Sequence, residues 1–118
     1  MPQITVDYSA PLADGFDRSG FALALHDAVV EIAAAKYEAC KTQFRATEDT
    51  TVGRDVDGHA IVHVTLGLLA GRTDETKARL TEAVLELLRT HVKPGEGTAL
   101  HASAEVRDLD PSYRKFES

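Results

Sequence analysis

Alternation of apolar and polar positions predicts four β-strands in this chain. The segments that show it are residues 2–9, 40–51, 60–69 and 98–108. In the first segment Ile4, Val6 and Tyr8 alternate with polar residues, which is the period-two pattern of a half-buried strand. The alternation is weakest in the second segment.

Residues 17–36 instead repeat their apolar side chains every three or four positions. Phe21, Leu25, Val29 and Ile32 then lie on one stripe, which predicts an amphipathic helix. We expect this helix to run from about Asp17 or Ser19 to Lys36.

A second helix is predicted to begin after Thr73. Thr73 is a suitable N-cap, and Asp74 and Glu75 complement the positive end of the helix dipole. Pro94-Gly95 is a strong stop signal. We therefore expect this helix to end just before that dipeptide.

The order strand–helix–strand occurs twice, in residues 2–58 and 59–118. We expect one domain of the α/β (α+β) class, built as a tandem βαβ repeat with a four-stranded sheet. Right-handed crossovers would place both helices on one face of this sheet. The other face then needs a partner subunit as cover. Between the halves, Asp57-Gly58 is typical of a hairpin turn.

Composition and charge exclude several classes of protein. The 118 residues carry a net charge of −6, which argues against a dedicated nucleic-acid binder. No segment approaches the roughly 18 apolar residues of a membrane span, and the N-terminal residues lack the features of a signal peptide. The single cysteine, Cys40, cannot form an intrachain disulfide, so we expect a reducing, cytoplasmic location.

Pro2 is the first candidate for chemistry. If Met1 is removed, Pro2 becomes an N-terminal secondary amine that can act as a base or a nucleophile. Pro2 shares parity with Ile4 and Val6, so it should face the apolar side of the sheet, where desolvation lowers the pKa of an amine. The alternative is that Pro2 has no catalytic role, as in many chains that carry proline at position 2.

Together with Pro2, residues 63–92 resemble the 5-carboxymethyl-2-hydroxymuconate Δ-isomerase family of the tautomerase superfamily. The matching features are HVTL at residues 63–66, AGR at residues 70–72 and ELLRTH at residues 86–91. The resemblance implies a tautomerase-like fold, a homotrimer, Pro2 as the proton-shuttling base and arginines that hold a dicarboxylate substrate. It also points to the catabolism of hydroxyphenylacetate-type aromatic compounds.

Arg72 matches the arginine of the family's Gly-Arg motif. It lies between a strand end and a helix start, where α/β proteins often bind ligands, and a guanidinium there can hold a carboxylate through two hydrogen bonds. A solvated arginine at the helix entry, or one paired with a neighbouring carboxylate, is the other interpretation.

The family usually carries Arg-x-Arg in its second strand, whereas this chain reads Gln43-Phe44-Arg45. Gln43 and Arg45 are therefore candidate substrate-binding residues, with Gln43 able to donate hydrogen bonds but without charge. Arg45 can alternatively serve the structure by pairing with an acidic neighbour.

The remaining residues suggest no metal or cofactor site. None of the five histidines has the spacing of metal ligands, and no phosphate loop, GxSxG elbow or dinucleotide fingerprint is present. We expect no cofactor, because the conjugated carbonyl of an unsaturated 2-oxo acid can itself hold the charge of a dienolate.

The leading interpretation is an isomerase that moves a proton within a small unsaturated 2-oxo or 2-hydroxy acid. The alternatives are a tautomerase-fold enzyme of dehalogenation, hydration or decarboxylation, or a non-catalytic trimeric binding protein. We expect a homotrimer, because one sheet face lacks helices and the tail carries the apolar residues Tyr113 and Phe116.

Overall fold

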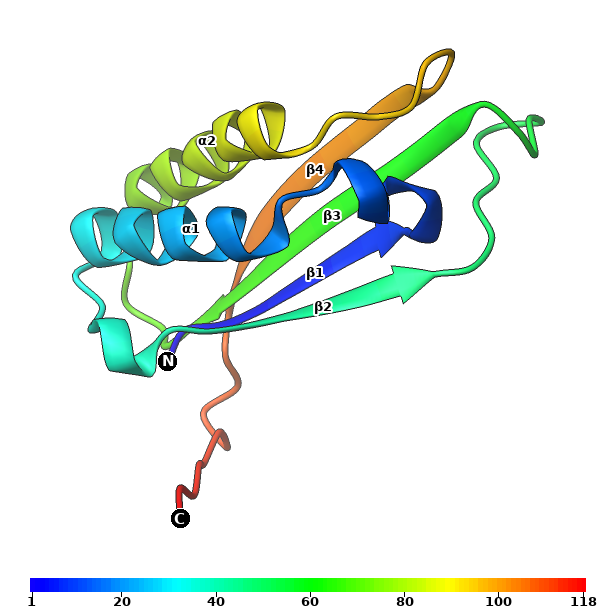
Figure 1. Ribbon diagram of the computed structural model, residues 1–118. Helices are drawn as coiled ribbons and strands as arrows, with labels where there is room; N and C mark the ends of the chain where they lie inside the picture. The colour runs from blue at the N-terminus through cyan, green and yellow to red at the C-terminus, as the bar shows by residue number, and fades with distance from the viewer.

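The computed structural model describes residues 1–118 and places two helices on one face of a four-stranded mixed sheet (Figure 1). The strands are β1 (Gln3–Ser9), β2 (Lys41–Thr47), β3 (His59–Leu68) and β4 (Ala99–Asp108). The helices are α1 (Arg18–Ala33) and α2 (Asp74–His91), with short 3-10 helices η1 (Ala10–Gly15) and η2 (Tyr37–Ala39). These elements confirm the predicted fold class.

The strand order is β2-β1-β3-β4. β1 pairs with β2 and β3 pairs with β4 in parallel, as expected of two βαβ units, whereas β1 and β3 are antiparallel. The prediction of a hairpin at Asp57-Gly58 is wrong. This loop connects β2 and β3, which do not pair, because β1 lies between them. The antiparallel centre brings the start of β1 beside the end of β3, with Gln3 opposite Gly67.

Side chains at the helix starts explain where both helices begin. Asp17 accepts a hydrogen bond of 3.0 Å from the N–H of Gly20, and Thr73 accepts one of 3.1 Å from the N–H of Thr76. These bonds satisfy N–H groups that have no partner within the helix. α2 ends at His91, as predicted. α1 ends three residues earlier than expected, because Ala34 adopts a left-handed conformation with φ 58°.

The core lies between the helices and the sheet. Its fully buried side chains include Val6, Val62 and Leu66 from the strands and Phe21, Leu25, Leu80, Val84 and Leu88 from the helices. The opposite sheet face carries no helix and presents the odd-numbered residues of the strands, including Thr5, Gln43 and Ser103. We call this surface the open face. Neither long helix has an apolar stretch that could cross a membrane.

Candidate active site

Pro2 directly precedes β1 and is fully buried, in line with Ile4, Val6 and Tyr8. Its carbonyl accepts a hydrogen bond of 3.2 Å from the N–H of Lys41. A proline suits the first position of a strand, because it has no N–H to contribute to the ladder. Pro2 is therefore held beside the start of β2, on the apolar side that its sequence parity predicted.

The amine at the start of the chain lies in surroundings that disfavour its charge. The Met1 nitrogen donates a hydrogen bond of 3.3 Å to the carbonyl of Ala39. Burial lowers the pKa of this amine most strongly, and the positive charges of Lys41 and Lys115 lower the pKa further. Pro2 is the adjacent residue, and its side chain is fully buried.

Arg72 lies between β3 and α2, at the end of the sheet where β1 begins. Its guanidinium donates hydrogen bonds to the carbonyls of Ala33 (2.9 Å) and Leu69 (3.3 Å). Ala33 is the last residue of α1, so Arg72 contacts the negative end of that helix dipole. The partners are main-chain carbonyls rather than a carboxylate. A guanidinium has five N–H donors, which leaves donors for a ligand.

Gln43 and Arg45 lie on the open face, on the opposite side of the sheet from the buried Pro2 side chain. Arg45 donates two hydrogen bonds to the Asp7 carboxylate, from Nε at 2.7 Å and from Nη2 at 3.1 Å. This contact is the acidic pairing that the sequence left as an alternative. Within one chain, the structure does not bring Gln43 or Arg45 to Pro2.

Lys41 is a residue that the sequence interpretation overlooked. It is the first residue of β2, and its Nζ donates a hydrogen bond of 3.3 Å to Ala39, the same carbonyl that accepts from the Met1 nitrogen. Its Nζ also lies 3.4 Å from the Glu117 carboxylate. The available signal was a positive charge at the start of a strand expected to lie beside Pro2.

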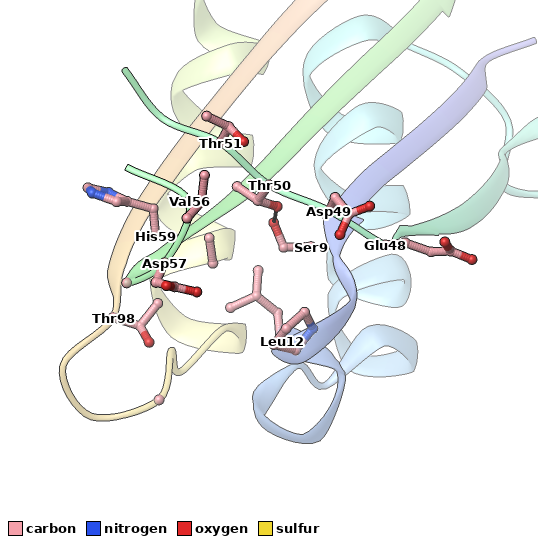
Figure 2. Close-up of a pocket in the computed structure, with 14 residues that line it drawn as sticks. Ser9, Leu12, Glu48, Asp49, Thr50, Thr51, Val56, Asp57, His59 and Thr98 are labelled. Carbon is pink, nitrogen blue, oxygen red and sulfur yellow. Dashed lines mark hydrogen bonds between the residues drawn. The ribbon is translucent and has the colours of Figure 1, made fainter. Parts of the chain in front are cut away.

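The most enclosed large cavity, of about 600 Å³, lies at the other end of β1 (Figure 2). Glu48, Asp49 and Asp57 are among its lining residues, and Figure 2 shows Asp49 beside Ser9 and Thr50, Asp57 across the cavity and the Glu48 carboxylate directed away from the two hydroxyls. Its lining contains none of the predicted site residues. Three carboxylates would repel an anionic substrate, so charge argues against this cavity as a binding site for a dicarboxylate.

The histidines are held by protein partners. His91 Nδ1 lies 2.7 Å from the Leu87 carbonyl, and His63 Nδ1 lies 2.6 Å from the Ser103 hydroxyl. His59 and His101 contact each other at 2.9 Å. No group of three or more His, Cys, Asp or Glu side chains is arranged to hold a metal ion.

Several solved structures share the fold. A 5-carboxymethyl-2-hydroxymuconate isomerase from Deinococcus radiodurans R1 has a TM-score of 0.79 and 16% identity, over 98% of this chain and 90% of that one. A fused 4-OT protein described as a wild-type symmetric trimer has a TM-score of 0.70 and 26% identity, over 91% and 85%. FG41 malonate semialdehyde decarboxylase, inhibited by 3-bromopropiolate, has a TM-score of 0.69 and 24% identity, over 98% and 89%.

The sequence itself identifies the family. No curated protein matches the chain. The family model described as 5-carboxymethyl-2-hydroxymuconate isomerase matches residues 2–117, which is nearly the whole chain. This match confirms the resemblance that Pro2 and residues 63–92 indicated. The chain therefore belongs to the 5-carboxymethyl-2-hydroxymuconate isomerase family and is an isomerase of the tautomerase type.

Proposed function

We propose that Pro2, freed by removal of Met1, is the base of this isomerase. It takes a proton from one carbon or from a dienol oxygen of an unsaturated 2-oxo or 2-hydroxy acid and returns it at another carbon. The observation that supports this role is the burial of Pro2 beside an amine whose pKa lies below its ordinary value. A lowered pKa supplies neutral amine near neutral pH, as general-base catalysis requires.

Arg72 is proposed to bind a substrate carboxylate. It lies at the same end of the sheet as Pro2, and its guanidinium can add a carboxylate to its two carbonyl partners. The substrate class is then a small dicarboxylic acid, in keeping with the family's name and with the catabolism of aromatic compounds. No residue in this scheme needs a cofactor.

Gln43 and Arg45 are proposed to act across a subunit boundary. Both point from the open face, where they are exposed in a single chain. We propose a cytoplasmic homotrimer in which the open faces turn inward and these side chains approach a neighbouring subunit. The fused 4-OT protein, which shares the fold, is a symmetric trimer.

The assembly is tested by the mass from light scattering at micromolar concentration. We expect a species of three chains that is active. An active species of 12.8 kDa, the mass of one chain, would contradict both the trimer and the shared site. An active dimer or hexamer would contradict only the number of subunits.

The base is tested in two steps. The mass of the intact protein shows whether Met1 is removed, and a retained Met1 would leave the Pro2 nitrogen in a peptide bond and end the proposal. Ketonisation of phenylenolpyruvate then measures proton transfer. Pro2→Ala should lower kcat/KM by about 10²- to 10⁴-fold, the usual contribution of general-base catalysis. Retained activity in a correctly folded Pro2→Ala protein would exclude Pro2 as the base.

A further inference from the structure

The tail that follows β4 leaves the sheet at the end at which β1 begins and extends beyond it, with side-chain contacts back to the sheet (Figure 1). Three contacts hold it there. The N–H of Leu109 donates a hydrogen bond of 2.7 Å to the Leu68 carbonyl, and Gln3 Nε2 donates one of 3.3 Å to the Tyr113 hydroxyl. Near the end of the tail, Glu117 lies 3.4 Å from the Nζ of Lys41. The tail therefore contacts β3, β1 and β2 in turn.

Two ammonium groups converge on one carboxylate oxygen of Glu117. Lys41 Nζ lies 3.4 Å and Lys115 Nζ 3.5 Å from Oε2. Without an anion between them, the two positive charges would repel each other. Two ammonium groups placed in this way attract a carboxylate, and in this chain the carboxylate is that of Glu117.

This carboxylate lies close to the start of the chain, where the proposed base Pro2 follows Met1. Lys41 Nζ and the Met1 nitrogen each donate a hydrogen bond of 3.3 Å to the carbonyl of Ala39, so the two nitrogens are separated by no more than two hydrogen-bond lengths. Pro2, the next residue, is hydrogen-bonded to the backbone of Lys41. An acid held by Lys41 would therefore lie within reach of the Pro2 nitrogen.

We propose that Lys41 and Lys115 bind one carboxylate of the substrate, and that Glu117 occupies their site as a competitor built into the chain until substrate displaces it. The inference rests on the proposed function of Pro2 and concerns the access of substrate to that same site. It assigns the tail a regulatory role and Lys41 a role in substrate specificity.

The strength of the Glu117 contact suits displacement. The side chains of Lys41, Glu117 and Lys115 are 40%, 59% and 51% exposed, and exposed ion pairs contribute little free energy. The two lysines nevertheless hold the pKa of Glu117 below its ordinary value, so it stays ionised at neutral pH. A substrate with two carboxylates can bind more tightly than the Glu117 side chain, because its second carboxylate can bind Arg72.

The test measures binding separately from turnover. Glutarate, a dicarboxylate that cannot tautomerise, is titrated into the protein by calorimetry at low ionic strength. Glu117→Gln should tighten glutarate binding by about two- to fivefold, the range for an exposed ion pair. Lys41→Gln and Lys115→Gln should each weaken it. Glu82→Gln, on the exposed side of α2, is the matched control that removes one negative charge elsewhere.

Kinetics with a dicarboxylate substrate provide the second measurement. Glu117→Gln should lower KM and leave kcat close to that of the Glu82→Gln control. Glutarate affinity and KM equal to those of the control would overturn the tail as competitor, and unchanged affinity in Lys41→Gln would overturn the lysine site. Failure of the Pro2 proposal is distinguishable, because it shows in the Pro2→Ala turnover and leaves the order of glutarate affinities intact.

Discussion

The two ends of the sheet occupy corresponding places in the βαβ repeat and carry opposite charge. At the start of β1, Lys41 and Lys115 lie close enough to the amine end of the chain to lower its pKa, and Arg72 lies at the same end of the sheet. At the start of β3, Asp57 and the acidic residues Glu48 and Asp49 line a cavity of about 600 Å³ (Figure 2). The cavity lined by these carboxylates is therefore not a suitable site for an anionic substrate. In a protein with a net charge of −6, a cluster of basic side chains at one end of the sheet is unusual and supports the substrate site proposed there.

Arg72→Ala gives the largest effect expected from this comparison. Loss of a charge-assisted hydrogen bond to a carboxylate should lower kcat/KM for a dicarboxylate substrate by about ten- to a hundredfold. Arg54→Ala, in the loop at the acidic end, is the matched control and should leave kcat/KM unchanged. Arg72 also contacts the last carbonyl of α1, so thermal unfolding is measured in parallel. A lower Tm with unchanged kinetics would show that Arg72 is purely structural.

Ser9→Ala, at the acidic end, should lower the stability of the fold and leave kcat/KM unchanged. The Ser9 hydroxyl is 2% exposed, accepts a hydrogen bond of 2.8 Å from the N–H of Ile61 and lies 2.7 Å from the Thr50 hydroxyl. Its removal takes this partner from the partly buried N–H of Ile61, which lowers the free energy of unfolding by about 0.5–1.5 kcal/mol, the net contribution of a typical hydrogen bond. Urea unfolding measures the loss, with the exposed Ser19→Ala as control. Reduced kcat/KM in the folded Ser9→Ala protein would assign the acidic end a catalytic part.

The pH profile of kcat/KM should show the smallest effect of the three. Only the neutral amine is a base, so activity falls as pH drops through the pKa of Pro2. Pro2 is buried, and burial, Lys41 and Lys115 lower the pKa of the Met1 amine next to it, so we expect the Pro2 amine to give an ascending limb with its midpoint below the ordinary α-amino value of about 8. Lys41→Gln removes one of these charges and should move the midpoint upward, whereas Arg54→Gln should not. A midpoint at or above 8 in the unsubstituted protein would contradict the desolvated base.

The well-predicted elements are those whose ends have local chemical signals. The Thr73 cap and the Pro94-Gly95 stop place α2 correctly, and alternation places β1, β3 and β4 to within a residue. The sequence predicts a first helix that continues to Lys36, whereas α1 ends at Ala33. Ala34 and Ala35 favour a helix, and no glycine marks the left-handed turn at Ala34.

The site was less predictable than the fold. The alternation in β1 correctly predicted that Pro2 is buried, and Arg72 lies after β3 and before α2 as expected. That Arg72 shares the Pro2 end of the sheet follows from the antiparallel pairing of β1 and β3, which the sequence did not predict. The contacts of Arg72 with main-chain carbonyls could not be predicted, because they depend on where α1 ends. Lys41 and Glu117 meet across 76 positions of sequence, and no local pattern encodes an ion pair between a strand start and a tail.

The position of β3 in the middle of the chain has a consequence for catalytic stoichiometry. The nitrogen of His59, at the start of β3, is committed to a peptide bond with Gly58, so it is neither a base nor a nucleophile. With Pro2 as the base, a polypeptide that contains the βαβ unit twice has one functional amine, whereas two separate units would have two. With Pro2 as the base, joining two βαβ units in one chain therefore gives one catalytic amine for two units, which is half the number that separate units would have. The second end carries Glu48, Asp49 and Asp57 and has no chain-terminal amine for an anionic substrate to approach.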